Sequence, residues 1–93
     1  MLSLLPIDLK NVKKEELNKE ICRAGIMAEY DAISLYEQMA AMTDNAGMKK
    51  MLLDIAKEEK THVGEFQALL LKLDEEQISE LKNGADEVEE KTS

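Results

Sequence analysis

Cysteine, proline, tryptophan and glycine are scarce in this chain of 93 residues. The one cysteine, Cys22, cannot form a disulfide within the chain, and it excludes a four-cysteine iron or zinc site there. With one proline, four glycines and few β-branched residues, the chain has little that would interrupt helices. We therefore predict an all-α fold.

Aromatic residues are also few, namely two tyrosines and one phenylalanine. A chain of this length makes at most one small domain, and these residues give it little material for a thick core. We therefore expect it to need a partner.

Clustered basic residues are absent, and the net charge is -8. Binding a nucleic-acid backbone requires such clusters, so we expect no nucleic-acid partner. Cations suit this charge better, including calcium at surface carboxylates, although exposed helix faces also need charge for solubility.

Long apolar runs are absent too. The start, MLSLLPIDLK, lacks a basic segment, and Pro6 interrupts its short apolar run. We expect neither a signal peptide nor a membrane anchor. The protein is therefore expected to be soluble and intracellular.

Helix start and stop residues divide the chain. A first helix is predicted from about residue 11 or 12 to Met42, turn-forming residues follow at 43–47, and a second helix reaches about Leu73. Asp74 and Gln77 resemble a capping box that starts a short third helix, which Asn83 and Gly84 would end. The predicted parts are an N-terminal extension (1–11), a helical hairpin domain (12–83) and an acidic tail or linker (84–93).

Each long helix carries an apolar stripe that is interrupted by ionisable residues. In the second helix the stripe follows a heptad pattern, and in the first helix its steps are also three and four. The second-helix stripe is Met48, Leu52, Ile55, Glu59, His62, Phe66, Leu69 and Leu73, and the first-helix stripe is Cys22, Gly25, Glu29, Ala32, Tyr36 and Met39.

The three ionisable residues of these stripes are predicted to lie at one level of the hairpin. Glu29 and the centre of the Glu59–His62 pair are equidistant from Asn45, which is in the turn. At about 1.5 Å per residue, Glu29 lies roughly 24 Å from the turn and the pair about 21 to 26 Å from it. All three side chains can therefore meet.

A shared metal ion explains this layer best, because an unpaired carboxylate within an apolar stripe costs several kcal/mol. Glu59-x-x-His62 alone is a weak motif, since glutamate is common in the chain. The alternative is a metal-free polar layer that sets helix register, or a wet gap filled by lysine side chains.

Two copies of the hairpin would supply the ligands of a carboxylate-bridged di-iron site. Such sites take a Glu from each of two helices and a Glu-x-x-His from each of the other two. A symmetric homodimer forming a four-helix bundle would bring Glu29, Glu59 and His62 from both chains around two ions. These ligands suit iron or manganese, and zinc as an unreactive substitute. Oxidation of ferrous iron is the natural reaction.

Tyr36 lies on the same face as Glu29, two helical turns further along, and its hydroxyl can hydrogen-bond a ligand carboxylate. A tyrosine in such a stripe can equally be part of the core. The methionines lie beside leucine and isoleucine, which indicates packing rather than a soft-metal site.

Three segments together resemble the encapsulated ferritins, short helical relatives of ferritin. These are AEYDAISLYEQMA (28–40), LLDIAKEEKTHVGEF (52–66) and ELKNGADEV (80–88). The resemblance implies that Glu29, Glu59 and His62 bind two irons at a dimer interface, beside Tyr36. It also implies a ring of dimers, commonly a decamer, inside an encapsulin compartment of the cytoplasm, where the oxidised iron is stored. It is greatest to the ferritin-like domain of fused encapsulin shell proteins.

Two features depart from that family. Its free-standing members usually end in a peptide that targets the shell, whereas this chain ends in EVEEKTS. Members often carry acidic residues before and after the first-helix glutamate that collect incoming metal. Here Ala28 replaces one of them and only Asp31 remains.

We therefore expect a ferroxidase of an iron-storage compartment. A rubrerythrin-like di-iron peroxidase is one alternative, although its rubredoxin module needs four cysteines. A metal-free helical scaffold is the alternative of another class.

Overall fold

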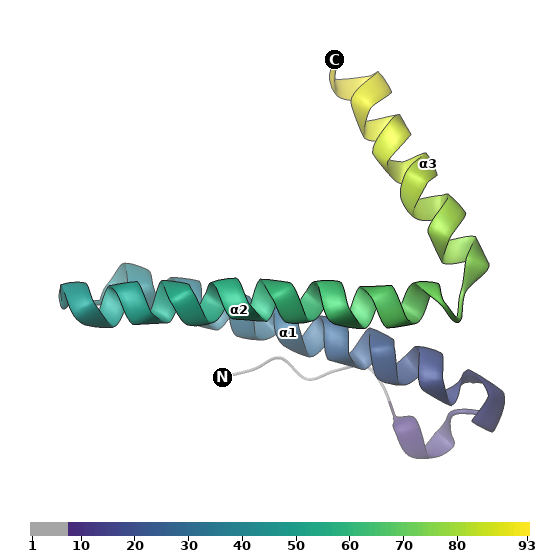
Figure 1. The fold of residues 1–93 in the computed structure, drawn as a ribbon, viewed down its shortest axis with the longest axis horizontal. Coiled ribbons are helices and arrows are strands. Elements are labelled where there is room, and N and C mark those ends of the chain that lie inside the picture. Colours follow the sequence, from purple (N-terminus) through teal and green to yellow (C-terminus); the bar gives the residue numbers. More distant parts are fainter. Residues whose placement is uncertain (1–7) are drawn as a thin grey trace.

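The structure is a computed structural model that describes residues 8–93. Two short 3-10 helices, η1 (Leu9–Asn11) and η2 (Lys14–Glu16), precede three α-helices, α1 (Leu17–Met42), α2 (Ala46–Leu71) and α3 (Glu75–Thr92). α1 and α2 run side by side as an antiparallel hairpin, and α3 leaves the end of α2 at a steep angle (Figure 1). The predicted all-α hairpin with a C-terminal helix is confirmed. The expectations for residues 1–7 lie outside the described part of the chain.

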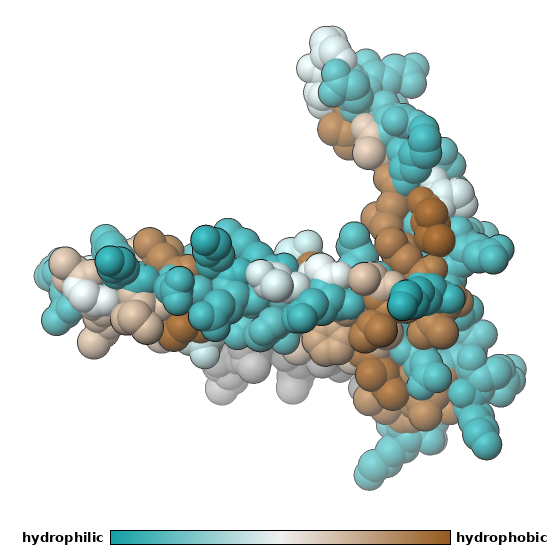
Figure 2. Space-filling model, in the orientation of Figure 1, coloured by the Kyte–Doolittle hydropathy of each residue, from teal (hydrophilic) through white to brown (hydrophobic). Residues whose placement is uncertain are grey.

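The molecule is flat and extended. Its principal extents are 46 × 43 × 19 Å and its radius of gyration is 16.4 Å, whereas a compact chain of this length has a radius of about 12 Å. Figure 2 shows apolar side chains exposed at the corner of α2 and α3 and along α3. Within residues 8–93, no helix combines the length and apolar character needed to cross a membrane.

The turn of the hairpin lies where the sequence predicts it, although α2 begins at Ala46, inside the predicted 43–47 segment. The side chain of Asn45 accepts a hydrogen bond from the backbone N–H of Met48 at 2.9 Å and so caps α2. The hydroxyl of Thr43 accepts one from the N–H of Asn45 at 3.2 Å. These bonds satisfy donors that the first turn of a helix leaves unpaired.

The predicted ends of the two long helices need small corrections. α1 begins at Leu17 rather than near residue 11, because Asp8 accepts hydrogen bonds from Lys10 and Asn11 and Val12 is extended. Local side-chain bonds of this kind compete with helix formation. α2 ends at Leu71 rather than Leu73, where a tighter turn takes over.

The prediction that Asn83 and Gly84 end the third helix is wrong. Asp74 starts α3 as predicted, since its side chain accepts a hydrogen bond from the N–H of Gln77 at 3.1 Å. The helix then continues to Thr92, because Gly84 does not adopt the left-handed conformation of a helix stop. Lys82 also pairs with Asp86 across that position at 2.8 Å. The predicted acidic tail is therefore helical almost to its end.

The core is a narrow line between α1 and α2. Its buried side chains are Cys22, Ile33, Ala40, Ala56, Val63 and Leu70. The predicted stripe on α2 lies about a fifth of a turn away from this line. It is half-buried in its middle, while Met48, Leu69 and Leu73 are exposed. The stripe is thus the margin of the hairpin and not its centre.

Candidate metal centre

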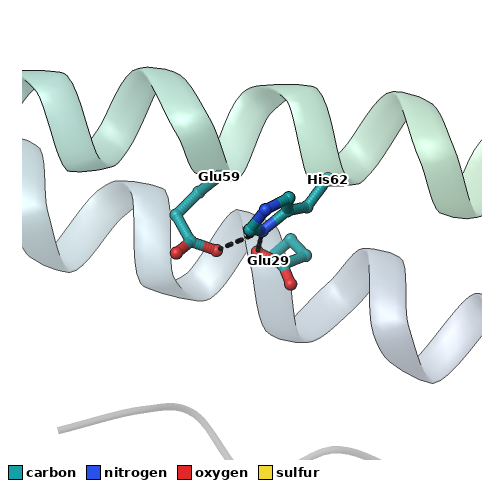
Figure 3. A group of neighbouring side chains, drawn as sticks. All are labelled: Glu29, Glu59 and His62. Atoms are coloured by element: carbon teal, nitrogen blue, oxygen red, sulfur yellow. Dashed lines mark hydrogen bonds and ion pairs between the residues drawn. The ribbon is translucent and has the colours of Figure 1, made fainter.

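Glu29 on α1 and Glu59 and His62 on α2 meet between the two helices, near the middle of the hairpin (Figure 3). One ligand atom from each residue lies within 4.8 Å of the other two. The expectation that these residues lie at one level therefore agrees with the geometry. Equal distance from the turn places them at one level, because the two helices are antiparallel and regular, and their positions in the two stripes turn them toward each other.

One ring nitrogen serves both acids. Nδ1 of His62 lies 3.4 Å from Oε2 of Glu59 and 3.4 Å from Oε2 of Glu29. Only the contact with Glu59 has hydrogen-bond geometry, and its length is at the upper limit for such a bond. Since Nδ1 carries at most one proton, it cannot satisfy two carboxylates.

Glu29 is the acid whose buried oxygen lacks a hydrogen bond. Its Oε2 atom is buried and has no hydrogen-bond partner, although the whole side chain is 19 % exposed. Leaving such an acceptor unsatisfied costs about 1–3 kcal/mol, and more when it is charged. Two neighbouring carboxylates also repel each other.

A cation between the three side chains removes both penalties. It would accept an oxygen from each glutamate and the lone pair of Nδ1 from the neutral imidazole. Two oxygens and one nitrogen suit iron, manganese or zinc. The buried oxygen without a hydrogen bond and the spacing of the ligand atoms therefore fit a metal ion.

The cluster is open on one side. The His62 side chain is 45 % exposed, while those of Glu29 and Glu59 are 19 % and 20 % exposed. All three residues belong to the half-buried stripes at the margin of the hairpin. A single hairpin therefore offers three ligands and leaves the rest of a metal's coordination to something outside it.

The other two predicted site residues lie outside this cluster. Tyr36 is half-buried on α1, and within residues 8–93 no hydrogen bond joins its hydroxyl to the three ligands. Asp31 is half-buried two residues after Glu29 and is not among the clustered ligands. The roles proposed for both residues stay predictions.

Known proteins resemble this chain in both sequence and structure. The sequence model of the rubrerythrin family matches residues 20–93. A crystal structure of the encapsulated ferritin domain from Pyrococcus furiosus superimposes with a TM-score of 0.82 and 52 % identity, covering 97 % of this chain and 94 % of that one.

Two curated proteins are similar in sequence. The ferritin-like–encapsulin shell fusion protein of Pyrococcus furiosus is 56 % identical over 99 % of this chain, which spans 27 % of that protein. The encapsulin nanocompartment cargo protein EncC of Myxococcus xanthus is 36 % identical over 90 % of this chain and 62 % of its own length. The chain thus spans about a quarter and about three-fifths of these relatives.

Proposed function

This chain belongs to the encapsulated ferritins, within the rubrerythrin family, and we propose that it oxidises Fe(II) to Fe(III) at a di-iron site shared by two copies. The observation that carries the proposal is the cluster of Glu29, Glu59 and His62, whose ligand atoms lie within 4.8 Å and include a buried oxygen without a hydrogen bond.

Two copies complete the site. A two-fold axis beside the exposed face of His62 would join two such clusters, giving four carboxylates and two imidazoles around two ions. The four negative charges then balance two ferrous ions. The half-buried stripe on α2 supports this arrangement, since a second hairpin packed against it would cover the open side of both clusters.

Iron is the substrate of the proposed reaction. Each Fe(II) loses one electron, and dioxygen takes two electrons and two protons to become hydrogen peroxide. Peroxide can serve as the oxidant instead and is reduced to water. When two ions are bound, the glutamates of both copies would hold them close enough for one oxidant to accept both electrons.

The proposed setting is an encapsulin compartment in the cytoplasm. The similarity to a fusion with an encapsulin shell and to an encapsulin cargo protein supports it. We propose that dimers assemble into a ring, as a decamer, and pass Fe(III) into the lumen of the shell. Manganese or zinc could bind to the same ligands in place of iron.

The experiment is an anaerobic loading of the chain with Fe(II), followed by air and by measurement of ferric absorbance. We expect Glu29→Ala and His62→Ala to slow oxidation by at least about tenfold. Glu58→Gln is the matched control, because Glu58 is next to Glu59 but exposed. Equal rates in all four proteins would favour a metal-free scaffold.

A peroxidase of the rubrerythrin type is the second candidate, because the family model that matches is that of rubrerythrin. These 93 residues hold one cysteine, whereas a rubredoxin module needs four. Turnover of hydrogen peroxide with a separate reductase, faster than oxidation of Fe(II) by dioxygen, would favour this candidate.

A further inference from the structure

The ring of Phe66 on α2 lies directly on the backbone of Gly25 on α1. A Cβ atom at position 25 would come within 2.7–2.8 Å of three ring carbons, Cδ1, Cε1 and Cζ, which is closer than real Cβ atoms come. Glycine is therefore needed for the ring to lie there. Gly64 and Gly84, in contrast, have no such neighbour within 4 Å.

This contact lies next to the metal centre. Phe66 is four residues after His62, and Gly25 is four residues before Glu29. Because the helices are antiparallel, both steps lead away from the turn by one helical turn, or about 6 Å. Side chains on a helix lean toward its N-terminus, so the Phe66 ring leans back toward His62.

We propose that Phe66, seated on Gly25, is a positioning residue of the metal centre. The ring fills the space between the helices on the side of the cluster that faces away from the turn. It thereby keeps the imidazole of His62 in the orientation that turns Nδ1 to both carboxylates, and it keeps water from the buried oxygen of Glu29. This inference rests on the proposed function, because it concerns the same three ligands.

The cluster needs such support because little else restrains the imidazole. The His62 side chain is 45 % exposed, and the one hydrogen bond that it makes within residues 8–93 is long, at 3.4 Å. A ligand that is held by packing binds metal more tightly than one that must be ordered during binding. Removing the ring frees His62 to rotate, and adding a methyl group at Gly25 displaces the ring.

The test uses cobalt(II) as a probe, since its visible absorption reports the geometry of its ligands. The metal-free chain is titrated with cobalt(II) as the wild type and as Gly25→Ala, Phe66→Ala, the double variant and Gly64→Ala. We expect Gly25→Ala and Phe66→Ala each to weaken binding by about tenfold, as loss of a supporting contact does, and to change the spectrum. Gly64→Ala adds the same methyl group where nothing is near, and should bind as the wild type does.

The double variant tests whether the two residues act as one unit. Without the ring, the methyl group at position 25 has nothing to displace, so the double variant should bind no more weakly than Phe66→Ala alone. Independent, additive losses would overturn the proposed pairing. If Gly25→Ala does not fold, the positioning role is tested with Phe66→Ala and its cobalt(II) spectrum, because Phe66→Ala only removes atoms.

Other outcomes separate this inference from the proposed function. If the wild type binds cobalt(II) and both single variants bind it with the same affinity and spectrum, the positioning role is wrong while the metal site stands. A lower thermal stability without weaker binding would likewise reduce Phe66 to a packing residue. If the wild type binds no cobalt(II), both proposals fail together.

Discussion

At the scale of single residues, Glu29 and Glu59 are not equivalent. Only Glu59 has a hydrogen bond from the ring of His62, while Oε2 of Glu29 is buried without a hydrogen bond, although it lies 3.4 Å from the same ring nitrogen. The metal-free chain therefore holds Glu29 at a cost in stability. Residues that a fold retains at such a cost are typical of functional sites.

The first prediction follows from this cost. Glu29→Gln should raise the free energy of unfolding of the metal-free chain by about 1 kcal/mol, because it removes a buried charge without a hydrogen bond. It should also weaken metal binding by at least about tenfold, since an amide is a poorer ligand than a carboxylate. Thermal unfolding and metal titration measure the two effects, with Glu58→Gln as the control. A less stable metal-free variant would contradict the cost assigned to Glu29.

The second prediction concerns Tyr36. If its hydroxyl bonds a ligand carboxylate in the loaded dimer, Tyr36→Phe should bind the same amount of iron but oxidise it about tenfold more slowly. The ring is kept, so packing on α1 should not change. Iron content and the oxidation rate are measured on one sample. Wild-type kinetics would leave Tyr36 as part of the core.

At the scale of elements, Arg23 ties α1 to the start of α3. Its guanidinium donates hydrogen bonds to Glu20 at 2.7 Å and to Asp74 at 3.2 Å, and Asp74 also caps α3. The bond to Glu20 is the main reason that the pKa of Arg23 is raised above its ordinary value. The guanidinium is charged at any ordinary pH, and its pair with Asp74 joins α1 to the corner from which α3 projects.

The third prediction separates the cap from the ion pair. Asp74→Asn keeps a capping side chain but loses the charge, so it should lower the free energy of unfolding by at most about 1 kcal/mol, as Arg23→Gln should. Asp74→Ala loses both and should cost about 1 kcal/mol more. Thermal unfolding, monitored by the circular dichroism signal of the helices, measures these losses. Equal losses in Asp74→Asn and Asp74→Ala would deny the cap a role.

The elements differ in how well the sequence predicts them. Asp74 was identifiable as a cap and 43–47 as the turn, and the level of Glu29, Glu59 and His62 followed from counting, because each depends on local or regular geometry. Gly84 was misjudged because a glycine ends a helix only when its φ is positive, and here it is not. The orientation of the Phe66 ring over Gly25 depends on packing between helices, which spacing alone does not specify.

The buried line of the hairpin shows a further limit. Counting in heptads marked the stripe through Glu59 and His62, whereas Ala56, Val63 and Leu70 are the buried positions of α2. A heptad pattern identifies faces that pack against something, but it does not tell which neighbour covers each face. Within one hairpin, the partner helix covers only one face of α2.

At the scale of the whole molecule, the fourth prediction concerns association. Anaerobic Fe(II) should convert separate or loosely associated chains into dimers or larger rings, because the proposed ligands are divided between copies. His62→Ala should remove this response. Sedimentation with and without Fe(II) measures it, and Gly64→Ala serves as a folded control. Association that is indifferent to Fe(II) and to His62 would contradict a shared site.

The exposed imidazole of His62 has a kinetic consequence. If each chain carries only half of the ligands, dilution below the concentration at which dimers persist should separate the halves. The initial rate would then fall with the square of the chain concentration instead of in proportion to it. Iron oxidation would in that case be fast wherever many copies are confined to a small volume, and slow for the same copies set free.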